Sequence, residues 1–249
     1  MRVRALHRRN GRGRLTRASA SLATARAAVL DAAEAAVIAF GWSTKALDAA
    51  VAQAGIDAPL ARRAFPRGPR SLLDEFHRAG DARMAAAMAS LDLAALRTGQ
   101  RIALAVRRRI EAIGDKRLAR RAVAFQVLPE NAPSAARSLA RSVDAIWRAA
   151  GDRSLDFSYY TKRATLAAVY AATVLYWLQD SSDDGAPTWA FLNRRLRGVA
   201  AFGAARKRAS AAVEGIASGA LGFAKRAAGV LRQGPGVFPT RWTGWRGTR

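Results

Sequence analysis

Hydrophobic residues recur at three- and four-residue intervals along most of the chain, which is typical of amphipathic helices. The first such helix begins near Ser19 and ends at Gly41. Ser43 or Thr44 can cap a second helix, and Asp57 can cap a short third one, because these side chains accept hydrogen bonds from the first free backbone amides. No run alternates apolar and polar residues as a half-buried strand does. The pattern therefore predicts an all-α fold.

The three short helices lie within residues 19–66 and are joined by tight turns. An Ala-Gly-Ile turn at 54–56 separates the second helix from the third. This spacing resembles the helix-turn-helix unit that opens TetR-type regulators. We expect a degenerate unit of this kind.

Longer helical patterns follow over residues 69–205, which we expect to form the main domain. The prolines at 66, 69, 129 and 133 interrupt the chain, because proline cannot continue a helix. The sequence predicts helices from Ser71 to about Ala95, from about Thr98 to Ile113, from Pro133 to Ala150, and from Pro187 to about Ala205. The most apolar helix lies between the last two.

The charge of the chain is strongly positive, with a formal net charge of +24. Such a protein is attracted to polyanions: nucleic acid, an anionic bilayer or an acidic partner. Residues 1–18 hold seven arginines and no acid. We interpret them as a disordered basic arm; a misplaced start, an organelle transit peptide or an arm that binds anionic lipid are the alternatives.

Side chains that carry chemistry are few. The chain has no cysteine and only two histidines, His7 and His77, and its acids are scattered. We therefore expect neither catalysis nor a metal or other cofactor. The longest apolar run, from Ala164 to Leu178, is shorter than the roughly 20 residues that span a bilayer, so it indicates a buried core helix.

Residues 209–232 form an amphipathic pattern of their own. Four glycines on the polar side weaken this helix in water, so its apolar face needs a partner: the protein core, a second copy or a bilayer. On the membrane interpretation the binding residues, with the basic flank, are Val213, Ile216, Ala220, Leu221, Phe223, Lys225, Arg226, Val230 and Leu231. Residues 233–249 show no periodicity and are predicted to be disordered.

A resemblance to a known family lies in the second half of the chain. It rests on Leu128–Ser134 (LPENAPS), Asp156–Tyr170 (DFSYYTKRATLAAVY), Gln179–Ser182 (QDSS) and Thr188-Trp189. These segments resemble the coenzyme Q nine family of ubiquinone-biosynthesis accessory proteins. The first half of the chain matches more loosely, through Phe40-Gly41-Trp42.

The resemblance implies a TetR-like fold of about ten helices, a homodimer, and a cavity that binds isoprenoid quinone intermediates or phospholipid. It also implies association with the coenzyme Q seven type of di-iron hydroxylase. The C-terminal amphipathic helix would then bind the inner face of a bacterial inner membrane or the matrix face of the mitochondrial inner membrane.

Site residues follow from the resemblance position by position. Arg163 falls where the family approaches a phospholipid head group, which a guanidinium can bind in a bidentate manner. The apolar side chains expected to line the lipid cavity are Leu139, Val143, Trp147, Leu166, Val169, Tyr170, Val174, Leu175 and Leu178. The expected partner interface comprises Asp144, Ile146, Asp156, Tyr159 and Tyr160.

The alternative is a TetR-type DNA-binding regulator with a hydrophobic ligand, which the positive charge favours. Its recognition segment would be Asp57–Phe65. That segment offers only Arg62 and Arg63, with no Asn, Gln or Ser, to read base edges. Specific nucleic-acid binding is therefore not expected.

Overall fold

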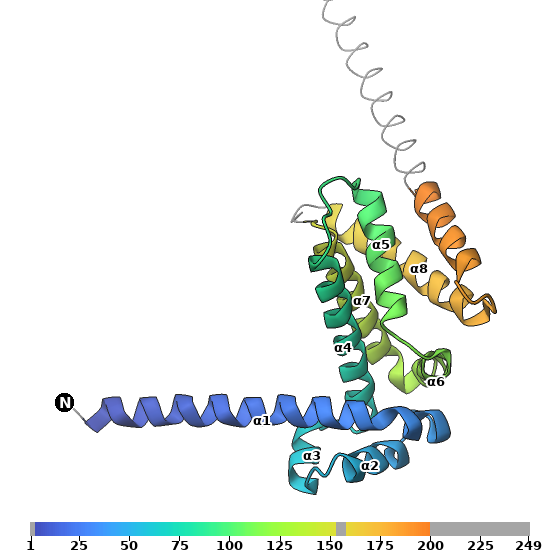
Figure 1. Ribbon diagram of the computed structural model, residues 1–249. Coiled ribbons are helices and arrows are strands. Elements are labelled where there is room, and N and C mark those ends of the chain that lie inside the picture. The colour runs from blue at the N-terminus through green and yellow to red at the C-terminus, as the bar shows by residue number, and fades with distance from the viewer. Residues whose placement is uncertain (1–2, 153–157, 200–249) are drawn as a thin grey trace, which may run out of the picture. The chain divides into compact units, whose positions relative to one another are not determined.

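The computed structural model describes residues 3–152 and 158–199, with side chains for 21–152 and 160–199. Over these ranges the chain forms helices and no strand (Figure 1). The predicted all-α fold is confirmed. The amphipathic segment 209–232, the tail 233–249 and the end of the main domain at 200–205 lie outside the described residues.

The first three helices have the predicted caps. Helix α1 spans Val3–Phe40 and ends at Gly41, whose positive φ of 68° suits glycine. The Ser43 side chain accepts a hydrogen bond from Ala46 N at the start of α2 (Thr44–Gln53). Asp57 accepts one from Leu60 N, at 2.7 Å, at the start of α3 (Ala58–Ala64). The predicted helix end at Gly41 and the predicted caps at Ser43 and Asp57 are confirmed.

Helix α1 begins earlier than expected. Residues 3–18 belong to it, where we expected a disordered arm. The physical reason is local: six of these sixteen residues are arginine, which has a high helix propensity, and no proline interrupts them, although Gly11 and Gly13 weaken the helix.

The remaining helices of the described residues are α4 (Pro69–Ala89), α5 (Thr98–Glu111), α6 (Lys116–Gln126), the 3₁₀ turn η1 (Pro129–Asn131), α7 (Ala132–Ala149), α8 (Ser158–Gln179) and a helix over 186–199. Helix α4 ends at Ala89, short of the predicted Ala95. There the Asp92 side chain accepts a hydrogen bond from Ala94 N, at 2.9 Å, and so stabilises a turn in place of a further helical turn.

Helix α4 is the element around which the bundle packs. It contacts α5 and α7, and α7 in turn contacts α8 (Figure 1). Its buried apolar face presents Leu72, Leu73, Phe76, Met84 and Met88 to these neighbours. Helix α1 packs on α2, α3, α4 and α6.

A buried ion pair joins α4, α5 and α7. Arg109 of α5, with 1% of its surface exposed, donates from Nε to Asp81 Oδ1 of α4 at 2.6 Å. Ser142 of α7 donates to the same oxygen at 2.7 Å. Gly80 makes room for the guanidinium, since a Cβ at this position would lie 2.8 Å from Arg109 Nη1. The three helices are thus held together by polar contacts at one level of the bundle.

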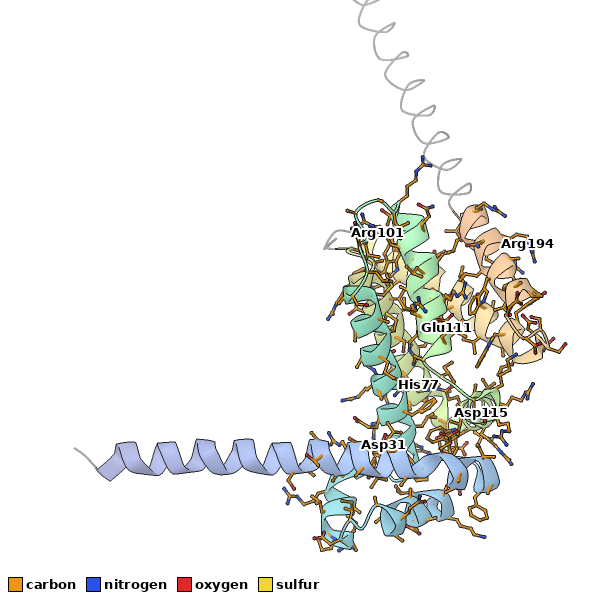
Figure 2. The ribbon with its side chains drawn as sticks, in the orientation of Figure 1. Asp31, His77, Arg101, Glu111, Asp115 and Arg194 are labelled. Carbon is orange, nitrogen blue, oxygen red and sulfur yellow. The ribbon has the colours of Figure 1, made fainter. Side chains whose placement is uncertain are left out.

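His77 lies one turn before Asp81 on α4 (Figure 2). The residue is half-buried, but its ring nitrogens face the protein: Nδ1 is 3.3 Å from Arg109 Nη2 and Nε2 is 3.0 Å from Gln126 Nε2 of α6. Burial, together with the charges of Arg109 and Arg141, lowers the pKa of His77 to about 3. The imidazole is therefore neutral at physiological pH.

This pKa predicts an acid-sensitive fold. The unfolded chain protonates His77 below its ordinary pKa of 6.5, whereas the folded chain does so only near 3, so folding stability falls as the pH drops from 6.5 towards 3. The slope due to this residue is about 1.4 kcal/mol per pH unit. The test is the free energy of unfolding in urea at pH 7 and pH 5 for the natural chain and for His77→Gln. We expect the natural chain to lose about 2 kcal/mol more than the variant. An identical loss in both would refute the assignment.

Candidate functional site: a groove between α4 and α7

An apolar groove of about 520 Å³ opens between the last turns of α4 and α7. Leu91 and Leu93, in the loop that connects α4 to α5, line one side of the groove. This loop lies at one end of the helical bundle (Figure 1). Its lining residues are Ala85, Met88, Ala89, Leu91, Leu93, Ala145, Arg148 and Ala149.

The lining follows from helical periodicity. Positions 85, 88 and 89 share one face of α4, and positions 145, 148 and 149 share one face of α7. Alanine fills four of these six positions, and its short side chain leaves space between the helices. Met88 is buried, while Leu91 is 38% exposed. Apolar surface thus extends from the protein core to the solvent.

Arg148 is the charged residue of this lining, and it connects the groove to a group of ionic side chains. Its Nη2 pairs with Asp144 Oδ2, one turn earlier on α7. The other carboxylate oxygen of Asp144 accepts from Arg163 of α8, at 2.8 Å from Nε and 2.7 Å from Nη2. Asp152 pairs with Arg163 at 3.6 Å and with Lys162 at 3.2 Å. The side-chain surface of Arg163 is only 13% exposed. In this structure the guanidinium expected to bind phosphate lies between two carboxylates.

The residues predicted to line a lipid cavity are placed mostly in the core. Val143, Trp147, Leu166, Val169, Tyr170 and Leu178 are buried, and Leu139 and Val174 are partly buried against them. Leu175 is 49% exposed. None of the nine lines the groove, nor the second cavity, a space of about 10 Å³ next to Asn131 that could hold one water molecule. Sequence reasoning missed the groove because alanine gives no signal for a binding site.

The predicted partner interface is brought together only in part. Tyr160 is 75% exposed near the start of α8, and Asp144 is half-buried among its ion pairs. Ile146 has no exposed surface, so its assignment to an exposed patch was wrong. It continues the buried stripe of α7, three residues after Val143. Asp156 and the side chain of Tyr159 lie outside the described residues.

Two motif residues have structural roles that sequence reasoning did not assign. Asn131 is buried; its side chain accepts from Arg70 Nε at 2.5 Å and donates to the Phe125 carbonyl at 2.8 Å, which ties η1 to α4 and α6. Asp180 accepts hydrogen bonds from the hydroxyl and amide groups of Ser182 and Thr188. These hydrogen bonds hold the pKa of the Asp180 carboxyl well below its usual range, and the bond from the Ser182 hydroxyl has the largest effect. Asp180 thereby fixes the turn between α8 and the helix over 186–199.

The described residues offer neither a metal-binding cluster nor a membrane-spanning helix. No group of three or more His, Asp or Glu side chains gathers there in a way that could hold a metal ion. None of the helices in this part of the chain combines the length and the hydrophobicity that crossing a membrane requires.

The arrangement of helices defines the class of fold. The TetR transcriptional regulator from Nitrosomonas europaea ATCC 19718 superimposes with a TM-score of 0.58, covering 70% of this chain and 97% of that one at 22% sequence identity. The chain therefore has a TetR-like fold. A match at 22% sequence identity shows a similar fold and does not show a similar function.

Residues 132–203, from α7 through the helix over 186–199, match the COQ9 family model. The mitochondrial ubiquinone biosynthesis protein COQ9 of Homo sapiens is 41% identical over 42% of this chain, and that of Drosophila melanogaster is 32% identical over 69%. The chain spans 33% of the human protein and 54% of the fly protein. The resemblance to the coenzyme Q nine family is confirmed over this segment.

Proposed function

We propose that the chain is a lipid-binding accessory protein of ubiquinone biosynthesis. It would bind an isoprenoid quinone intermediate or a phospholipid at a membrane surface and present it to the di-iron demethoxyubiquinone hydroxylase. The similarity to the COQ9 proteins supports the pathway, and the groove between α4 and α7 supports the binding of lipid. We further propose a homodimer on the inner face of a bacterial inner membrane, or on the matrix face of the mitochondrial inner membrane. The names of the relatives describe those proteins as mitochondrial.

The groove is the observation that carries this proposal. Its volume of about 520 Å³ lies within the range of about 300–1,000 Å³ that is usual for small-molecule sites. Seven of its eight lining residues are apolar, as an isoprenoid or acyl chain requires. Each Å² of apolar surface that the chain removes from water contributes about 25 cal/mol. A hydrocarbon tail is therefore the ligand that gains most from binding here.

An accessory role fits the buried polar side chains better than catalysis does. A general acid or base for use near neutral pH needs a pKa close to 7. The pKa of His77, about 3, is far from that value, and its ring nitrogens contact Arg109 and Gln126. The carboxylate of the buried Asp81 accepts hydrogen bonds from Arg109 and Ser142. These groups stabilise the fold.

Filling the groove should abolish lipid binding. Ala85 is an exposed residue that lines the groove, so a tryptophan here can occupy its space without entering the core. We expect Ala85→Trp to weaken the binding of a short-chain prenylquinone by at least ~10-fold, about 1.4 kcal/mol, in calorimetric titration. Ala86→Trp is the matched control, because Ala86 is equally exposed on α4 but does not line the groove. Equal binding by the two variants would remove the groove from the proposal.

The proposed hydroxylase interface includes Tyr160. An exposed aromatic ring beside charged side chains is typical of an interface hot spot. We expect Tyr160→Ala to weaken the affinity for a purified di-iron demethoxyubiquinone hydroxylase by ~10-fold or more while the melting temperature is unchanged. Val127→Ala serves as the control, since Val127 is 71% exposed and lies at the end of α6. An unaltered affinity in the Tyr160 variant would place the interface elsewhere.

The proposed membrane contact is the segment 209–232. Its predicted amphipathic helix would lie in the head-group region of an anionic bilayer. We expect a chain lacking residues 209–249 to stop sedimenting with vesicles that contain anionic phospholipid, and to keep its melting temperature. A marked fall in that temperature would show that the segment packs in the protein core instead.

A further inference from the structure

One charged side chain lines the groove, and its positive charge indicates which kind of head group a ligand can carry. Arg148 lies in the last turn of α7 and lines the groove, and its side chain is 73% exposed. Arg163 was the residue expected to bind phosphate. Its side-chain surface is 13% exposed, and the guanidinium pairs with Asp144 and Asp152.

The two arginines are held with different strength. Arg163 donates to Asp144 from both Nε and Nη2, so it is fixed by two hydrogen bonds in a largely buried place. Arg148 pairs with the same carboxylate through Nη2, and its side chain is 73% exposed. A surface ion pair of this kind contributes at most about 1 kcal/mol. Arg148 can therefore leave Asp144 at small cost, and Asp144 keeps a cationic partner when it does.

The ends of two helices at the groove repel anions, so an anionic ligand can bind there only with the help of a cation such as Arg148. Both α4 and α7 end at the groove, at Ala89 and Ala149, and the C-terminal end of a helix carries partial negative charge. Without a cation this rim would repel an anion. With Arg148 it can accept one, because a guanidinium forms charge-assisted, bidentate hydrogen bonds with phosphate or carboxylate.

We propose that the groove selects a hydrocarbon chain with an anionic head group, a phosphate or a carboxylate, and that Arg148 binds this head group after releasing Asp144. The inference rests on the proposed lipid binding and narrows its ligand class. A lipid with a neutral head would gain only from the apolar lining. An anionic lipid gains from the lining and from Arg148.

Three probes of equal chain length test the inference: geranylgeranyl phosphate, geranylgeranoic acid and geranylgeraniol, titrated below their micelle-forming concentrations. We expect the natural chain to bind at least one of the two anions ~10-fold more tightly than the alcohol, with an affinity that falls as salt is added. The anion that binds more tightly tells whether the head group is a phosphate or a carboxylate.

The variants separate the effect of Arg148 from that of overall charge. Arg148→Gln should lower the affinity for the preferred anion by ~10-fold and leave that for the alcohol unchanged. Arg117→Gln is the matched control: Arg117 is 65% exposed, pairs with Asp115, and lies on α6 away from the groove lining. It should alter neither affinity.

The outcomes distinguish the two proposals. If the natural chain binds all three probes equally well, or if Arg148→Gln behaves like Arg117→Gln, the head-group inference is wrong and lipid binding stands. If none of the probes binds, the proposed lipid binding fails, and the inference fails with it.

Discussion

The buried contacts of Asp81 with Arg109 and Ser142 join α4 to α5 and α7 next to the groove. Ser142 of α7 donates to the oxygen of Asp81 that accepts from Arg109, so α4 and α7 are joined at this level. The groove begins one turn further along both helices, at Ala85 and Ala145. Above a fixed contact, short side chains leave a gap that the helices cannot close by moving together. The groove therefore depends both on the polar contacts of Asp81 and on the alanines one turn further along α4 and α7.

A buried ion pair is an expensive way to join helices, because both charges lose their hydration. Well-packed apolar residues of similar volume can be as stable as a buried ion pair. The pair of Arg109 and Asp81 adds specific geometry, since the guanidinium fits against Gly80 and the carboxylate oxygen accepts from both Arg109 and Ser142. These contacts bring one face of α4 against both α5 and α7 one turn before the groove.

Sequence reasoning reached the local features and missed the distant ones. The caps at Ser43 and Asp57 and the glycine stop at Gly41 depend on neighbours in the chain, so they could be predicted. The contact of Arg109 with Asp81 joins two helices, and nothing local marks either residue as buried. The assignment of the buried Ile146 to the partner interface failed for a different reason. The periodicity of α7 placed Ile146 on the buried stripe with Val143 and Trp147, and the family resemblance overrode that correct signal.

Asp144 links the two surfaces that the proposed function requires. On one side it holds Arg148 at the groove, and on the other it holds Arg163 near the start of α8, three residues after the exposed Tyr160. Lys162 reaches Asp152 and also lies 5.5 Å from the ring of Trp147, so this end of α8 is attached to α7 by both charge and packing. Asp144, a residue of the proposed partner interface, thus also pairs with the arginine that lines the proposed ligand site.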